Sequence, residues 1–255
     1  MKLLKYLGLS TFLFLLIFPA MAQKRNLEGN PTFTTIEFNS TDGLKITADL
    51  YQIEDANAPY IILFHQARYS RGEYREIAPK LNILGFNCIA VDQRSGDKVN
   101  GVINETHSRA IEKGLPTEYT DAFPDLVASL LYVKENFKPT KTIVWGSSYS
   151  SALVFVLAAK YPDDVDGVLS FSPGDYFSID GRLVSDFAKE VSCPVFITSA
   201  KNEQESWQPI YDNLSVKEKS FFLPDTKGFH GSKALWEENE GNQRYWKAVE
   251  GFLKA

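Results

Sequence analysis

The sequence is poor in the side chains that bind metals and form disulfides. Its 255 residues include two cysteines and three histidines, without a C-x-x-C pattern or a cluster of histidines. It therefore predicts no metal site, and no motif in it calls for a cofactor. Cys88 and Cys193 each begin an apolar run, where a free cysteine behaves as a small buried hydrophobe. We expect both to be unpaired.

Long apolar runs are missing after residue 22. Before that point, two lysines precede an apolar stretch at 7–18, and an A-x-A pattern ends at Ala22. This arrangement is typical of a cleavable signal peptide over 1–22. The stretch is short for a membrane span. We expect a mature protein over 23–255 that is periplasmic or secreted, with an uncleaved N-terminal anchor as the alternative.

The chain also lacks an excess of positive charge. Without the two lysines of the predicted signal, 25 basic residues stand against 32 acidic ones, a net charge of −7. Nucleic acids and anionic membrane surfaces attract basic proteins. Neither is therefore an expected partner, whereas a neutral small molecule fits this charge.

What the sequence does contain is strand-like apolar runs that alternate with helix-like stretches. An N-terminal antiparallel hairpin is expected at 33–38 and 44–51. Further strands are expected at 60–64, 87–91, 142–145, 168–171, 195–199 and 220–223. Helices are expected at 75–84, 119–136, after the strand that begins at Thr142, at 182–190 and at 233–253. This alternation predicts a single α/β domain with a mostly parallel sheet and helices on both faces. The polar segment 97–120 is interpreted as an insertion over the sheet edge.

One strand-to-helix junction carries a recognisable motif. An apolar run ending at Trp145 is followed by Gly146-Ser147-Ser148-Tyr149-Ser150, which follows the nucleophile-elbow pattern G-x-S-x-G except for its last residue. Ser148 lies two residues after the first small residue, which is the position of the nucleophile. A frame centred on Ser150 also fits, but it places that serine in the first helical turn, where capping of free N–H groups is the more ordinary role.

Residues with reactive or polar side chains come directly after the predicted strands. Ligands of such sheets bind outside the carboxyl ends of the strands. The residues in these positions are His65, Gln66, Asp92, Arg94, Ser148, Pro173, Glu203 and His230.

In this order of elements and motifs the chain resembles the α/β-hydrolase superfamily, and within it the dienelactone-hydrolase-like and small esterase branch. The resemblance extends over the whole predicted mature chain. Its more specific parts are the elbow and the segment Gly228-Phe229-His230-Gly231. The chain departs from the family at Ser150, where glycine is usual, and at His65-Gln66, where His-Gly is commoner. The resemblance implies an α/β-hydrolase fold without a large lid.

A serine nucleophile needs an adjacent base, and in this fold the order along the chain is serine, acid, histidine. His230 is the only histidine after Ser148. The resemblance places the acid at the spacing of Glu203 after its strand. Glu205 and Asp225 are the alternatives.

The resemblance also implies an oxyanion hole formed by the backbone N–H groups of Tyr149 and Ala67, with Gln66 as the alternative to Ala67. His65 is interpreted as a residue that orients this loop, and not as a base. Gln66, Tyr176 and Trp207 are candidates for contacts with the substrate.

These observations favour a serine hydrolase that cleaves a carboxylic ester, with a short acyl group, through an acyl-enzyme. A peptidase or a thioesterase on the same fold is the alternative. A binding protein on a hydrolase scaffold is a third hypothesis, but such a protein is expected to have lost a member of the triad. No member is missing here.

Overall fold

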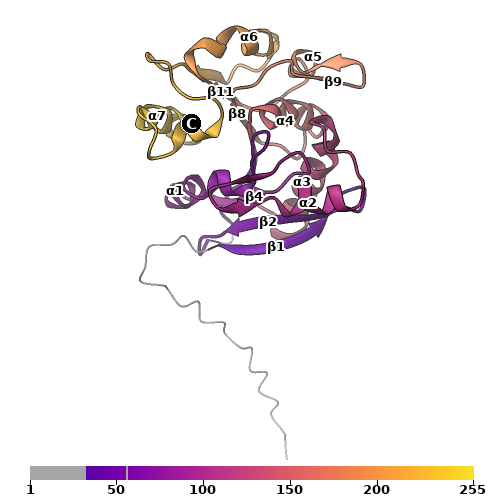
Figure 1. The fold of residues 1–255 in the computed structure, drawn as a ribbon. Coiled ribbons are helices and arrows are strands. Elements are labelled where there is room, and N and C mark those ends of the chain that lie inside the picture. The colour runs from indigo at the N-terminus through magenta and orange to yellow at the C-terminus, as the bar shows by residue number, and fades with distance from the viewer. Residues whose placement is uncertain (1–32, 56) are drawn as a thin grey trace, which may run out of the picture. The chain divides into compact units, whose positions relative to one another are not determined.

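The apolar runs of the sequence form the strands of one large sheet. The computed structural model describes residues 33–255 except Ala56, so the predicted signal peptide lies outside the described residues. Within these residues, eight strands pair in the order β1-β2-β4-β3-β7-β8-β11-β12 (Figure 1). Their bounds are β1 Thr34–Asn39, β2 Lys45–Tyr51, β3 Tyr60–Phe64, β4 Asn87–Val91, β7 Thr142–Ser147, β8 Gly167–Phe171, β11 Val195–Thr198 and β12 Lys219–Phe222. β1, β2 and β4 pair antiparallel, and every other pair is parallel. The predicted mostly parallel sheet with an N-terminal hairpin is confirmed.

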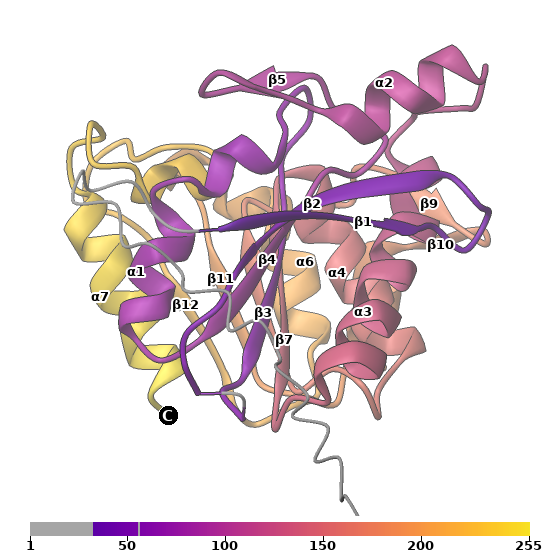
Figure 2. The same ribbon diagram turned by 90° about the horizontal axis from the view of Figure 1, so that it is seen from below.

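Side chains alternate between the two faces of the sheet along each strand, and in the central strands both faces are buried. In β3, Ile62 and Phe64 join one hydrophobic core, and Ile61 and Leu63 join the other. Helices cover both faces (Figure 2). α1 (Ile77–Ile83) and α7 (Asn242–Leu253) lie on one face, whereas α3 (Phe123–Phe137) and α4 (Tyr149–Lys160) lie on the other. Among the described helices, none combines the length and apolar composition that a bilayer span requires.

Three helical regions differ from the sequence prediction. The expected helix over 233–253 is a 3₁₀ turn, η4 (Ser232–Leu235), followed by a separate α7. Gly241, with φ of +83°, precedes α7, and a residue in this conformation interrupts a helix. The helix α6 (Gln204–Asn213) was not predicted, and it contains Pro209. The expected helix over 182–190 is reduced to β10 (Arg182–Leu183), which pairs with β9 (Ser178–Ile179), and the short α5 (Val184–Ala188).

The polar segment after β4 contains more regular structure than its sequence indicated. It forms a small hairpin of β5 (Lys98–Val99) and β6 (Val102–Ile103), followed by α2 (Glu105–Glu112). Asn104 caps α2 by accepting a hydrogen bond from the N–H of His107, at 2.7 Å. Thr106 accepts one from the N–H of Thr47, which attaches α2 to β2.

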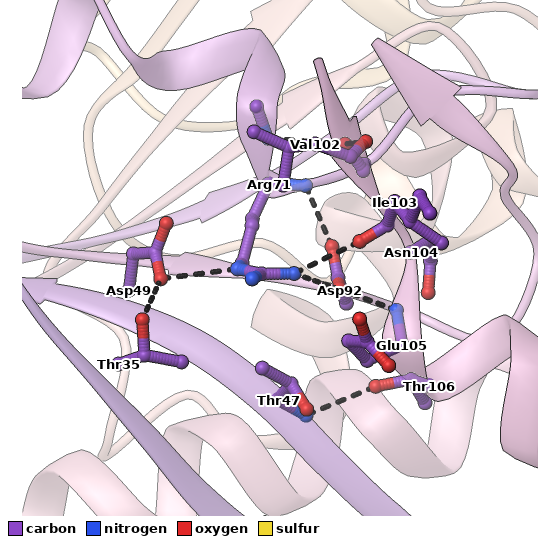
Figure 3. Close-up of polar contacts among 12 residues, drawn as sticks. Thr35, Thr47, Asp49, Arg71, Asp92, Val102, Ile103, Asn104, Glu105 and Thr106 are labelled. Atoms are coloured by element: carbon purple, nitrogen blue, oxygen red, sulfur yellow. Dashed lines mark hydrogen bonds and ion pairs between the residues drawn. The ribbon is translucent and has the colours of Figure 1, made fainter. Parts of the chain in front are cut away.

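Arg71 attaches this segment to the sheet through buried charges (Figure 3). Its guanidinium donates to Asp92 at 2.6 Å, to Asp49 at 3.0 Å and to the carbonyl oxygen of Ile103 at 3.0 Å. Asp92 also accepts a hydrogen bond from the N–H of Glu105. Burial raises the pKa of Asp92 to about 6, although Arg71 opposes the rise. Removing one partner of such a buried pair typically costs about 3–5 kcal/mol, so the segment is fixed and not a loosely attached flap.

The two cysteines are buried and free, on opposite sides of β7. Cys88 is in β4, and Cys193 precedes β11, four strand positions away in the sheet. At ~4.8 Å per strand this separation is roughly 19 Å, whereas a disulfide needs Cα atoms within about 7 Å. We expect intact mass analysis to show two modified thiols after alkylation in denaturant without reductant. Recovery of unmodified protein would contradict the unpaired state.

Candidate active site

The junction between β7 and α4 has the geometry of a sharp, strained turn. Ser148 has φ of +58° and ψ of −120°, a conformation that non-glycine residues seldom adopt. A side chain at Gly146 would place its Cβ 2.3 Å from the carbonyl oxygen of Ser150, so this position requires glycine. Such strain persists only where the surroundings enforce it, and it is concentrated at functional sites. Ser148 is partly exposed, whereas Ser147 and Ser150 are fully buried.

The structure brings together the three residues that the sequence proposed as a triad. His230 Nε2 lies 2.7 Å from Ser148 Oγ, and His230 Nδ1 lies 2.7 Å from Glu203 Oε1. Glu203 comes from the short turn η3 (Lys201–Glu203) after β11, and His230 from the loop after β12. The three side chains therefore converge at the carboxyl ends of β7, β11 and β12. If Nδ1 carries the proton, Nε2 is free to accept the proton of the serine hydroxyl.

Glu203 has a second set of partners on its other oxygen. Oε2 accepts hydrogen bonds from Ser172 Oγ at 2.7 Å and from the N–H of Ala200 at 3.1 Å. Burial alone would raise the pKa of Glu203, but the hydrogen bonds from His230 and Ser172 outweigh it and hold the pKa below its usual value. The carboxylate is thus ionised at neutral pH and can stabilise a positively charged imidazole.

The alternatives for these roles lie elsewhere. Glu205 is exposed at the start of α6, and Asp225 is exposed and paired with Arg244. The hydroxyl of Ser150 is buried within reach of the carbonyl oxygens of Phe64, His65 and Ser147. It also accepts a hydrogen bond from the N–H of Ser147, so the small side chain at this position holds the turn together.

The loop after β3 places Ala67 as an N–H donor. The N–H of Gln66 is already occupied, since it donates to Glu73 Oε2 at 2.8 Å. In contrast, the described residues offer no hydrogen-bond acceptor to the N–H of Ala67 or to that of Tyr149, the first residue of α4. These two donors are therefore available to a ligand.

His65 holds this loop as a neutral imidazole. Its Nε2 accepts hydrogen bonds from the N–H of Gln93 and the amide of Asn104, which leaves Nδ1 to donate to the carbonyl oxygen of Gln66 at 2.9 Å. Burial lowers the pKa of His65 to about 4, so the ring is uncharged at neutral pH. His107, on α2, contacts the carbonyl oxygen of Arg94 and not the site.

The candidate substrate contacts have different surroundings. Tyr176 is 42% exposed and donates to the carbonyl oxygen of Ser172, beside Glu203. Gln66 is buried, and its side-chain Oε1 has no hydrogen-bond partner among the described residues. Trp207 is fully buried, donates to Ser199 and packs against Phe221. Its position in the hydrophobic core contradicts the predicted contact with substrate.

Sequence reasoning missed two polar residues that organise the site. Ser172 links Glu203 to the histidine loop, because it also accepts a hydrogen bond from the N–H of Gly231 at 2.9 Å. Its signal was its place directly after β8. Glu73, in the 3₁₀ turn η1 (Arg71–Tyr74), gave no signal, because a glutamate in a polar turn is ordinarily exposed. In the part of the chain that the structure describes, no group of three or more histidine, cysteine or acidic side chains is arranged to hold a metal ion.

Comparison with known proteins points to one family. A family model described as the alpha/beta hydrolase fold matches residues 59–191, just over half of the chain. No curated protein matches the sequence. A dienelactone hydrolase from Anabaena variabilis superposes with a TM-score of 0.69 at 15% identity, covering 88% of this chain and 98% of its own.

Two other solved structures show the same arrangement. The Pyrococcus furiosus esterase Pf2001 has a TM-score of 0.65 at 18% identity, covering 88% of this chain and 92% of its own. Est1E from Butyrivibrio proteoclasticus, with ferulic acid bound, has a TM-score of 0.65 at 15% identity, covering 86% and 98%. At these identities the likenesses establish the fold, in agreement with the resemblance seen in the sequence. The family match and the topology together show that this protein belongs to the α/β-hydrolase family.

Proposed function

We propose that the protein is a serine hydrolase that cleaves carboxylic esters through an acyl-enzyme. The observation that carries the proposal is the position of the His230 ring, which bridges Ser148 and Glu203 with two contacts of 2.7 Å. Structural neighbours named as esterases and as a dienelactone hydrolase support an ester as the substrate class.

In this proposal Ser148 Oγ attacks the ester carbonyl carbon while His230 Nε2 takes the hydroxyl proton. The carbonyl oxygen becomes an oxyanion, which accepts hydrogen bonds from the N–H groups of Ala67 and Tyr149. Loss of such a donor typically costs ~2.7–4 kcal/mol of transition-state stabilisation. His230 then gives its proton to the departing alcohol. Water then attacks the carbonyl carbon of the acyl-enzyme, with His230 again as the base, and the free acid leaves.

Throughout this cycle Glu203 keeps its negative charge. It fixes the tautomer of His230 with the proton on Nδ1, and it stabilises the imidazolium that forms when Nε2 accepts the serine proton. The hydrogen bonds from Ser172 and Ala200 hold the carboxylate in the orientation that these roles require.

The surroundings of the site favour small acyl groups. The segment over 97–112 is attached to the sheet through the buried Arg71–Asp92 pair, an arrangement that does not favour a mobile apolar lid. The interval after β8 carries Asp175, Asp180 and Arg182. We expect kcat/KM on p-nitrophenyl esters to be highest for short acyl chains, without a jump where long-chain substrates form droplets.

The measurement is a series of esters of increasing acyl length, below and above their solubility limits, beside a thioester and a peptide substrate. Maximal rates on long acyl chains, or activation at droplets, would contradict the proposal that no mobile apolar lid covers the site. A preference for the thioester or the peptide would contradict the carboxylic ester as the bond that the protein cleaves.

A further inference from the structure

Directly behind the elbow lies a buried carboxylate that the triad does not use. Glu73 is completely buried, and each of its oxygens accepts one hydrogen bond. Oε1 accepts from Ser147 Oγ at 2.7 Å, and Oε2 accepts from the N–H of Gln66 at 2.8 Å. A buried acid without a basic partner within salt-bridge distance is costly, so its presence calls for a compensating role.

These contacts connect the three loops that carry the proposed site. Gln66 directly precedes Ala67, and Ser147 directly precedes Ser148. Ser147 Oγ in turn accepts a hydrogen bond from the N–H of Ser232, at 2.8 Å, two residues after His230. One carboxylate therefore links three segments: the loop after β3 that carries Ala67 (the oxyanion loop), the elbow, and the loop after β12 that carries His230 (the histidine loop).

The packing of the three loops is equally close. A Cβ at Gly231 would lie 2.4 Å from Gln66 Oε1 and 2.6 Å from Ser147 Oγ, and Gly231 has φ of +73°. The backbone of Gly231, beside His230, thus packs directly against the oxyanion loop and the elbow. A small shift of either one would move the imidazole.

The ionised form of Glu73 suits this arrangement, because both oxygens accept hydrogen bonds. A proton on one oxygen would displace a donor or reverse the hydrogen bond with Ser147. Burial raises the pKa of Glu73 to about 7, while the hydrogen bonds and the nearby His230 and Lys233 oppose the rise. Tyr69 and Tyr74 are the other titratable groups facing it. Burial raises the pKa of both, and the charge of Glu73 adds to the rise.

We propose that Glu73 is a positioning residue, whose carboxylate holds Ala67, Ser148 and His230 in the geometry required for acyl transfer. The proposal rests on the hydrolase function proposed above. Glu73 does not contact the reacting atoms. It acts through Gln66 and Ser147, and its effect belongs to the transition state and not to substrate binding.

The test is Glu73→Gln, which keeps the volume but supplies one acceptor where the carboxylate supplies two. We expect kcat to fall roughly 10²-fold, the loss typical of a displaced oxyanion donor, with KM little changed. The matched control is Glu76→Gln, an exposed glutamate three residues away, which should retain wild-type kcat. Wild-type kcat in Glu73→Gln would overturn the proposal.

Thermal unfolding shows whether the Glu73→Gln variant stays folded in the assay and whether Glu73 titrates in the folded wild type. Because the folded protein retains a proton on Glu73 that the unfolded chain releases above about pH 4.5, the wild type loses stability as the pH rises to about 7. Glu73→Gln has no such loss. The difference between the Tm of Glu73→Gln and that of the wild type should therefore shift in favour of the variant from pH 5 to pH 8, even though kcat has fallen. A Tm of Glu73→Gln below the assay temperature, with the residual kcat accounted for by the folded fraction, would indicate a structural role and overturn the proposal.

A readout independent of catalysis is the nitrogen NMR spectrum of the histidine rings. Glu73→Gln should shift the ring signals of His230 and leave those of His107, on α2, in place. Unchanged His230 signals would overturn the positioning role. If the wild type hydrolyses no substrate, the proposed function fails, whereas the His230 signals still decide whether Glu73 positions that ring.

Discussion

Ser148→Ala is expected to abolish both ester hydrolysis and labelling by a fluorophosphonate probe. The probe reacts only with a serine that an adjacent base activates, and Ser148 is the hydroxyl that lies 2.7 Å from His230 Nε2. Loss of a serine nucleophile reduces kcat on the order of 10⁶-fold in a well-studied serine protease. Labelling is measured by intact mass, and hydrolysis by release of p-nitrophenol.

The neighbouring serines provide matched controls for this experiment. Ser147→Ala and Ser150→Ala should each leave a labelled protein, although labelling can be slower because both hydroxyls stabilise the turn. Labelling that persists in Ser148→Ala and disappears in Ser150→Ala would show that the nucleophile is Ser150, in the first turn of α4.

The second large effect is expected from the other members of the triad. His230→Ala should cost nearly as much as Ser148→Ala, because triad members act as a unit and their losses do not add. Glu203→Gln should reduce kcat less, by roughly 10⁴-fold, since an amide keeps the shape but no longer fixes the tautomer or stabilises the imidazolium. Both are measured as kcat on the preferred ester, with folding checked by circular dichroism.

Glu205→Gln is the control for the acid, because Glu205 is a glutamate of the same region whose side chain is exposed. We expect it to retain almost all activity. If Glu205→Gln were the more damaging of the two substitutions, the assignment of the acid would be wrong.

Much of the fold followed from local sequence patterns. Tyr60–Phe64 and Asn87–Val91 are short, mostly apolar runs that end at a polar residue, and they form strands with the bounds expected. The elbow was equally visible, because its steric crowding requires small residues at fixed positions such as Gly146. In these segments the local preference and the tertiary structure agree.

The features that sequence reasoning missed depend on contacts between distant segments. Trp207 lies after a strand, as a substrate contact would, but the helix that carries it turns its ring into the core. The role of Glu73 is recognisable only in the assembled structure, since its partner Ser147 is 74 residues away along the chain. The place of Ser172 after β8 was a signal, but its contact with Gly231, 59 residues away, was not visible in the sequence. No periodicity encodes such contacts.

The separation of the triad along the chain has a consequence for folding. Ser148 and His230 are 82 residues apart, and their contact requires β7, β8, β11 and β12 to be paired in register. Parallel pairings of this kind close long loops before they gain stability, so they form slowly compared with helices. Partly folded forms with native-like helices would lack the assembled triad. Recovery of hydrolysis during refolding should therefore lag behind the recovery of helical signal, and enzymatic rate would report on the final step of assembly.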